Sequence, residues 1–431
     1  MVAAAVFAFD SVGFPPGTLA RPARLTLNFG FLLLEAYLFG VLFRAVGLPK
    51  ISGYIVAGIL FGPHGLGVIG EAWVKPMKLV DDLALTIIAL AAGAELALER
   101  LRPRLREVAS VLGATVVLAI PAILGFLMVG GRDLFPFLPE DWGGRVGAAL
   151  VMAVIATGRS PTAAIALIRE CRAKGPFTDL SFTVTIAMDT VVILLFAAAV
   201  AVAGGLATGG GVQLGFLALV AAQIAASVVL GVLLGWVLSK ALGRMTVELP
   251  TMLIVFAFFL VEFAGWFSHQ FQALFGLPFH LEALLIAISA GFFVRNASPH
   301  GARLHGGIQA ISLPIFAVFF AMTGVHLDVS LVARLWLPAL LFVVARMVVL
   351  GGATFAGAVW HTGAPRAGLL GMTFLTQAGV SLGLAQEMVR RFPGWAEVGT
   401  FLVACITVNE VVGPILFKYA LDRSGESGGE P

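Results

Sequence analysis

The residue with the clearest chemical capacity is Asp189, the single charged residue in an apolar run from Phe182 to Ala203. If this run crosses a bilayer, an unpaired carboxylate inside it costs about 3 kcal/mol or more, and carboxylates kept in such places are usually functional. A carboxylate in hydrocarbon is neutralised when it binds a proton or a small cation. We therefore predict that Asp189 binds a proton or a monovalent cation inside the membrane.

The competing interpretation is a permanent ion pair between Asp189 and an arginine of the membrane region. Arg346, in "LLFVVARMVVLGG", is the first candidate partner and Arg159 is the second. A guanidinium stays protonated, so Arg346 is also suited to fixed charge compensation in the core. We favour the functional interpretation of Asp189 over the ion pair.

Two segments place helix-breaking residues in the middle of apolar runs. "ATGRSPTAA" contains Gly158 and Pro161, and "LTQAGVSLG" contains Gly379. Such a segment can unwind and offer backbone carbonyls and hydroxyls to an ion where it lines a cavity. Either segment alone is equally compatible with an ordinary kinked helix. Their matched places in the two halves of the chain favour a paired discontinuous site.

Polar side chains near these segments are candidate ligands. The hydroxyls of Thr157 and Ser160, with freed carbonyls, are predicted to complete the shell of an ion at Asp189, because hard oxygen donors suit alkali cations. A possible secondary group comes from the second half of the chain: Gln377, Asn409 and Glu410. For Asn409 and Glu410, a second ligand pair and a structural counterpart of Asp189 are equally compatible with the sequence.

The composition excludes a water-soluble globular protein. Of the 431 residues, 59% are hydrophobic and 12% are charged, and the mean hydropathy is +1.00. Soluble domains carry about a quarter charged residues. The two cysteines, Cys171 and Cys405, have no metal-type spacing and are expected to be free thiols, so we expect no cofactor. The N-terminus lacks a basic region, which argues against a cleaved signal peptide.

The apolar runs predict an all-α polytopic membrane protein with about thirteen transmembrane helices. Their approximate limits are 25–46, 51–69, 79–98, 108–130, 146–168, 179–203, 212–239, 249–269, 281–297, 309–325, 335–360, 366–390 and 396–421. Residues 1–24 would form an N-terminal extracellular segment, residues 25–421 the transmembrane domain and residues 422–431 a short cytoplasmic tail. The loops that face the cytoplasm in this arrangement hold most of the Lys and Arg residues, which predicts an outside N-terminus and a cytoplasmic C-terminus.

An internal repeat divides the transmembrane domain. "LLEAYLFGVLFRAVGLP" is matched by "LVEFAGWFSHQFQALFGLP", "AAGAELALERL" by "AMTGVHLDVSL", and Met188-Asp189 falls opposite Asn409-Glu410. The matches predict two six-helix repeats, 25–203 and 249–421, joined by a linker helix over 212–239. Seven crossings separate equivalent helices, so the repeats are inverted, with discontinuous helices that cross near the middle of the membrane.

The motifs "GLPKISGYIVAGILFGPHGLG", "AAGAELALERLRP", "ATGRSPTAAIALIRECRAKGPFT" and "LPIFAVFFAMTGVHLDV" carry a family resemblance. Together they resemble the sodium/hydrogen exchanger-type membrane domain of the monovalent cation:proton antiporters, over about residues 28–420. The branch that they resemble is bacterial and includes glutathione-gated potassium efflux proteins.

The resemblance implies a thirteen-helix homodimer in the plasma membrane of a prokaryote, with a mobile core that moves like an elevator. It implies that Asp189 is the ion-binding carboxylate and Arg346 the basic residue of the core. Two positions depart from the family pattern. Met188 stands where electrogenic relatives carry a second aspartate and many others carry Asn or Gln, and Val380 stands where efflux-type relatives often carry a glutamate.

The sequence thus predicts a secondary antiporter, not an enzyme, that exchanges a monovalent cation for protons. Sodium, potassium and lithium all remain open. Met188 cannot titrate and Arg346 does not deprotonate, which predicts electroneutral exchange unless Glu410 carries a second proton. A sodium-coupled symporter of an organic solute on a related inverted-repeat fold is the alternative, and a channel is the next.

Overall fold

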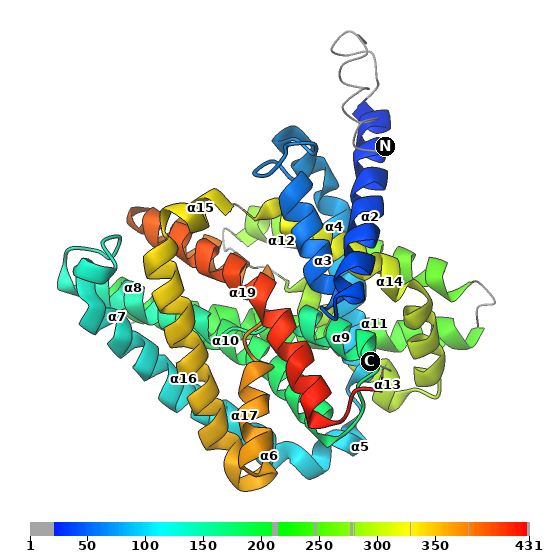
Figure 1. Ribbon diagram of the computed structural model, residues 1–431. Coiled ribbons are helices and arrows are strands. Elements are labelled where there is room, and N and C mark those ends of the chain that lie inside the picture. Colours follow the sequence, from blue (N-terminus) through cyan, green and yellow to red (C-terminus); the bar gives the residue numbers. More distant parts are fainter. Residues whose placement is uncertain are drawn as a thin grey trace.

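The computed structural model describes residues 21–208, 214–244, 248–275, 279, 281–327, 329–377 and 379–428 (Figure 1). Within these ranges the regular structure is entirely helical. Most of the predicted N-terminal segment 1–24 and the end of the predicted tail 422–431 lie outside the described residues.

The longer helices follow one another along the chain with short connections. They are α2 (Arg21–Ala45), α3 (Lys50–Phe61), α4 (Glu71–Glu95), α6 (Leu105–Ala114), α7 (Ile120–Leu134), α8 (Trp142–Ala156), α9 (Pro161–Glu170), α10 (Pro176–Thr208), α11 (Leu214–Arg244), α12 (Leu249–Phe275), α13 (Ala283–Ala297), α14 (Gly301–His326), α16 (Trp336–Thr362), α17 (Ala364–Met372), α18 (Gly379–Arg391) and α19 (Ala396–Ser424). In the described part of the chain, 9 helical segments are long and apolar enough to cross a membrane, and two shorter apolar helices, α3 and α13, accompany them.

Each predicted transmembrane run coincides with one helix or with consecutive helical segments, which confirms the all-α polytopic fold. The predicted end of the second run, at residue 69, is wrong, because α3 stops at Phe61. Gly62 and Pro63 follow directly, and Gly67 takes a positive φ of 68° in the turns beyond. Such residues end a helix even where the apolar composition continues.

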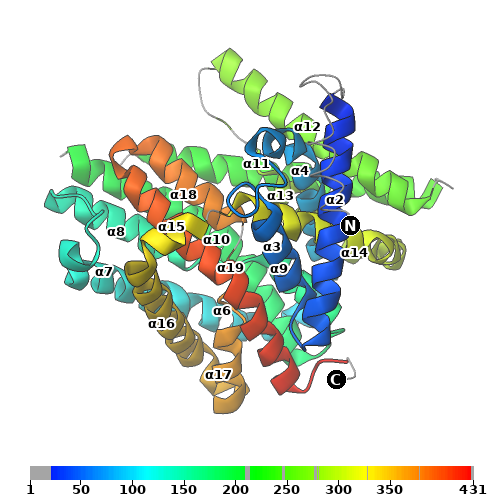
Figure 2. The same cartoon turned by 45° about the horizontal axis from the view of Figure 1, so that its top comes forward.

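The helices form two bundles that lie side by side (Figures 1 and 2). The first bundle contains α2, α3, α4 and α11 to α14, and the second contains α6 to α10 and α16 to α19. Glycines allow close contact within the first bundle: a Cβ on Gly93 of α4 would overlap the carbonyl oxygen of Ile288 on α13, and one on Gly324 of α14 would overlap that of Ile55 on α3. Small residues at helix contacts let backbones approach, which drives packing in lipid.

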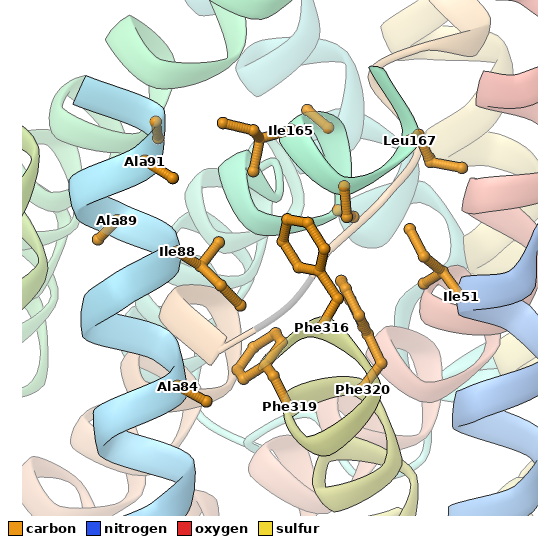
Figure 3. Packing of buried hydrophobic residues seen from close by; sticks show 14 of the residues in the cluster. Ile51, Ala84, Ile88, Ala89, Ala91, Ile165, Leu167, Phe316, Phe319 and Phe320 are labelled. Atoms are coloured by element: carbon orange, nitrogen blue, oxygen red, sulfur yellow. The ribbon is translucent and has the colours of Figure 1, made fainter. Parts of the chain in front are cut away.

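The two bundles meet across an apolar contact around α9. Figure 3 shows three phenylalanines of α14, Phe316, Phe319 and Phe320, beside Ile88 of α4, with Ile165 of α9 above them in the view. All five side chains are buried in the same hydrophobic cluster. The second bundle has a hydrophobic cluster of its own, built from α7, α8, α10, α16 and α19. The molecule therefore has an internal boundary, and the candidate site lies on it.

Candidate functional site

Two broken helices form the centre of the second bundle. α8 ends at Ala156 and α9 begins at Pro161, so the four residues between them leave the helical path. α17 ends at Met372 and α18 begins at Gly379, which gives a second break. The predicted discontinuous helices are confirmed, although the second break starts at Thr373, earlier than the predicted stretch around Gly379. Gly379 itself is the first residue of α18.

The two breaks are joined directly. The backbone N–H of Ser160 donates to the carbonyl of Thr376 at 3.0 Å. The Ser160 hydroxyl caps α9 by accepting from the N–H of Ala163 at 3.1 Å, and Pro161 fits the first turn because it needs no donor there. Ser160 and Pro161 thus end the break and begin α9.

Arg346 of α16 connects the breaks from the other side. Its guanidinium is fully buried and donates to three carbonyls: to Ala156 at 2.7 Å, Gly158 at 3.0 Å and Leu375 at 3.0 Å. These are the carbonyls that a helix end leaves without partners. Arg346 therefore compensates the negative ends of the interrupted helices, and it makes no ion pair with Asp189 among the described residues.

Gln377 is a second link between the halves. Its side-chain nitrogen donates to the carbonyl of Ile155 at 3.1 Å, and its side-chain oxygen accepts from Asn409 at 2.9 Å. Asn409 also donates to the carbonyl of Cys405 in its own helix. These amides are thus occupied with holding the breaks against α19, which favours the structural interpretation of Asn409.

Asp189 lies on α10 beside this crossing, and it is 7% exposed. Its Oδ1 atom is buried and finds no hydrogen-bond partner in the described part of the chain. The carboxylate faces a cavity of about 20 Å³, which is room for about one water molecule. Ser160 and Thr162 line this cavity from the second bundle, and Leu85 of α4 and Leu284 of α13 line it from the first.

Arg159 lines the same cavity and is 1% exposed. One of its terminal nitrogens donates to the Thr115 hydroxyl at 3.0 Å, and the guanidinium carbon lies 3.5 Å from the centre of the Phe374 ring. Its Nε and Nη1 atoms have no hydrogen-bond partner among the residues described. A cation–π contact of this kind holds the guanidinium in place without a carboxylate. Arg159 therefore adds positive charge to the cavity but no ion pair to Asp189.

The structure brings together some of the predicted site residues and separates others. Ser160, Arg159 and Asp189 share one cavity. Thr157 does not line it, and its hydroxyl donates to the carbonyl of Val154 at 2.8 Å. Glu410 lines a different cavity on the far side of Leu85.

The sequence reasoning missed Thr162 and Thr115. Thr162 lines the Asp189 cavity, and its hydroxyl lies 2.9 Å from that of Ser160. Its place two residues after Ser160, in the same helix-breaking segment, is a signal that could have identified it. No sequence signal ties Thr115, which lies between α6 and α7, to Arg159, which lies in the break between α8 and α9.

The donors at the Asp189 cavity suit a hard cation of low charge. One carboxylate and two hydroxyls face the cavity, and all of these are oxygen donors. No group of three or more His, Cys, Asp or Glu side chains in the described ranges could hold a metal ion. Cys171 and Cys405 are both free and buried.

A multi-span helical fold with a buried carboxylate beside two interrupted, crossing helices defines the class as a membrane transporter. The chain belongs to the family described as "Sodium/hydrogen exchanger, transmembrane", whose sequence profile matches residues 31–421. This family is one of transporters of the antiporter type.

Named relatives match shorter stretches. The chain is 26% identical over 187 residues to "K(+) efflux antiporter 2, chloroplastic" of Arabidopsis thaliana, which covers 42% of this chain and 15% of that protein. It is 32% identical over 109 residues to "Na(+)/H(+) antiporter NhaS5" of Synechocystis, which covers 25% of this chain and 15% of that protein. The matches thus span a small part of the length of these relatives.

Solved structures match the fold over nearly the whole chain. The sodium proton antiporter MjNhaP1 of Methanocaldococcus jannaschii at pH 8 superposes with a TM-score of 0.68 at 15% identity and covers 94% of this chain and 97% of that one. An electron-microscopy structure of MjNhaP1 superposes with a TM-score of 0.73 at 14% identity and covers 96% and 100%. The polytopic antiporter fold is therefore shared.

Proposed function

We propose that this protein exchanges a monovalent cation for protons, and that Asp189 binds the two in turn. The observation that carries the proposal is the buried Oδ1 atom of Asp189, which has no partner within the described structure, in a residue that lines a cavity of about 20 Å³. A fixed ion pair would engage this oxygen. Family membership supports the same reaction class.

Exchange follows from competition at one carboxylate. A bare Asp189 that crosses the membrane barrier carries a negative charge without an ion-pair partner through a region of low dielectric constant, which is costly. Protonation or cation binding neutralises that charge. Only the two loaded forms cross readily, so each inward movement of one ligand is matched by an outward movement of the other.

Side-chain hydroxyls are proposed to complete the cation's shell. Ser160 and Thr162 already face the cavity of Asp189. Thr157 remains a candidate ligand only for a state in which it turns toward the cavity, because its hydroxyl now points to the carbonyl of Val154. Gln377 and Asn409 are assigned to the support of the breaks and not to the ion.

The movement is proposed to be an elevator-type displacement of the second bundle against the first. The Asp189 cavity lies on the boundary between them, and the contact shown in Figure 3 is apolar, so that few polar bonds oppose sliding. The inverted repeats 25–203 and 249–421, a homodimer in a prokaryotic plasma membrane, and an outside N-terminus belong to the same proposal.

The size of the cavity argues against a symporter of an organic solute. A space of about 20 Å³ admits one water molecule or one small ion. Pockets for organic ligands are usually hundreds of cubic ångströms.

The test uses purified protein in proteoliposomes. A preset pH gradient should dissipate when sodium, potassium or lithium is added to the outside, and the order of potency identifies the cation. Saturable flux of no more than about 10³ ions per second is expected if the slowest domain motion of the proposed cycle takes about a millisecond. Unitary currents, or proton flux that needs an organic substrate, would overturn the proposal.

A further inference from the structure

A second and larger cavity lies across Leu85 from the Asp189 site. Its volume is about 880 Å³, and Leu85 lines both cavities. Asp81 of α4 and Thr323 of α14 line it from the first bundle, and Gln386 of α18 and Glu410 of α19 line it from the second. The cavity therefore spans the boundary between the two bundles, on the face that the loop charges predict to be outside.

Two carboxylates that line this cavity each have one buried oxygen without a hydrogen-bond partner among the described residues. Glu410 is 5% exposed, yet its Oε2 atom accepts no hydrogen bond from any described residue. The Oδ1 atom of Asp81 is likewise buried without a partner in the described chain. Buried carboxylate oxygens are expensive to leave unpaired. Two of them in one cavity indicate a ligand that is positively charged.

The other charged and titratable groups of the cavity make no hydrogen bond to these two oxygens within the described structure. Lys78 is the lysine that lines it, and its ammonium lies 2.6 Å from the carboxylate of Asp82, which faces a different cavity. Glu71 adds another acid to the lining, and His64 and His326 are the remaining titratable groups. The Nδ1 atom of His326 is engaged by the carbonyl of Met322 at 2.7 Å.

We propose that Asp81 and Glu410 form a second binding site for an alkali cation, separate from the site at Asp189. Their carboxylates would bind the ion together with water, and Gln386 and Thr323 offer further oxygen donors in the same cavity. Hard oxygen donors suit an alkali ion, and a space of this size accommodates an ion that keeps part of its hydration shell. Protons compete for the same two carboxylates.

The site lies between the two bundles, so its occupancy affects how they are held together. Asp81 belongs to the first bundle and Glu410 to the second, so an ion between them holds the bundles together on this face. Without an ion or a proton, two like charges face each other in a region of low dielectric constant. The site therefore stabilises one arrangement of the bundles when it is occupied.

The experiment measures cation-dependent thermal stability of purified protein in which Asp189 is replaced by Asn, so that the transport site cannot contribute. Sodium chloride and potassium chloride are titrated against choline chloride at constant ionic strength and at alkaline pH. We expect a rise in the apparent Tm of at least about 2 °C at saturation. The rise should shrink at acidic pH, where protons occupy the carboxylates.

Two further variants and one control show which residues the cation-dependent rise in Tm requires. Asp189→Asn/Glu410→Gln and Asp189→Asn/Asp81→Asn should each lose the rise, while Asp189→Asn/Glu262→Gln should keep it, because Glu262 is exposed on α12 and lines neither cavity. Both carboxamide replacements conserve size, and the Tm without cation shows that each variant is folded.

Three results would overturn the inference. They are an equal rise with choline, no rise in Asp189→Asn itself, or a rise that survives either Glu410→Gln or Asp81→Asn. Because binding is measured in a protein that cannot transport through Asp189, the outcome is independent of whether antiport is observed.

Discussion

The replacement of Arg346 by methionine tests the proposed architecture of the site most directly. Methionine has a similar length and packs well in a membrane core, so it removes the guanidinium with little change in volume. Three hydrogen bonds are lost, at 2.7, 3.0 and 3.0 Å, to carbonyls of both breaks. Ala156, Gly158 and Leu375 are then left with buried carbonyls that have lost their donor.

The magnitude follows from the number of carbonyls affected. A buried polar group without a partner costs about 1–3 kcal/mol, so three of them cost roughly 3–9 kcal/mol. Water that reaches the site reduces this cost. We expect Arg346→Met to lower the apparent Tm by about 5 °C or more and to abolish exchange. Arg346→Lys should fall between wild type and Arg346→Met, because one ammonium cannot reproduce three donors spread over a planar fork.

The assay is the fluorescence-monitored unfolding of detergent-purified protein at a fixed scan rate, since unfolding of such proteins is seldom reversible. Arg366→Met is the matched control, because Arg366 is exposed on α17 and should leave the Tm unchanged. A wild-type Tm together with wild-type exchange in Arg346→Met would show that the carbonyls are compensated in another way, and the role assigned to Arg346 would be refuted.

Three other predictions concern the transport site. Asp189→Asn should abolish cation-dependent proton flux while the protein remains folded and monodisperse, and wild-type exchange in this variant would remove Asp189 from the mechanism. Ser160→Ala and Thr162→Ala should each raise the apparent KM for the cation about fivefold, which corresponds to roughly 1 kcal/mol for a lost oxygen ligand; unchanged KM values in both would exclude these hydroxyls from the shell. Exchange should be electroneutral, so the reversal potential in proteoliposomes under a potassium/valinomycin voltage should follow the chemical gradients alone, and a voltage-dependent balance point would point to a second proton on Glu410.

Much of this fold could be predicted from the sequence, because a bilayer leaves few structures open to the chain. Apolar runs of sufficient length must become helices, and their number and order follow from hydropathy. The breaks could also be predicted, since Gly158 and Pro161 mark one of them in the sequence. The predicted helix limits that are wrong, such as the end of the second run where α3 stops at Phe61, lie where glycine and proline end a helix inside an apolar stretch.

Contacts between side chains on different helices could not be predicted from the sequence. An ion pair between Arg346 and Asp189 was the competing interpretation, because each residue is an isolated charge in an apolar run. In the structure Arg346 reaches the breaks with its guanidinium, while Asp189 faces the first bundle. Which face of a helix a charge occupies depends on helix rotation and tilt, and one sequence fixes neither. Asp81 was missed for the same reason, since its relation to Glu410 arises only when α4 and α19 meet at a cavity.

The direction of the interrupted helices matches the positions of the positive Arg346 and the negative Asp189. A helix carries partial negative charge at its C-terminus and partial positive charge at its N-terminus. Arg346 binds carbonyls at and beyond the C-terminus of α8. The cavity of Asp189 is lined by Pro161 and Val380, which belong to the first turns of α9 and α18. The carboxylate thus faces two positive helix ends, each worth about 0.3–1 kcal/mol to an anion.

Arg159 adds a full positive charge to the same cavity, and this predicts its role in turnover. A positive charge near Asp189 stabilises the bare carboxylate relative to both loaded forms, so it weakens cation binding and speeds release. We expect Arg159→Gln to lower the apparent KM for the cation several-fold and to lower the maximal rate, because a tightly held ion leaves slowly.

Arg159→Lys should keep near-normal values, since it keeps the charge but loses the hydrogen bond to Thr115 and part of the contact with Phe374. Initial rates across a cation titration in proteoliposomes separate the two parameters. A higher KM in Arg159→Gln, or equal changes in Arg159→Gln and Arg159→Lys, would show that Arg159 acts through packing and not through its charge.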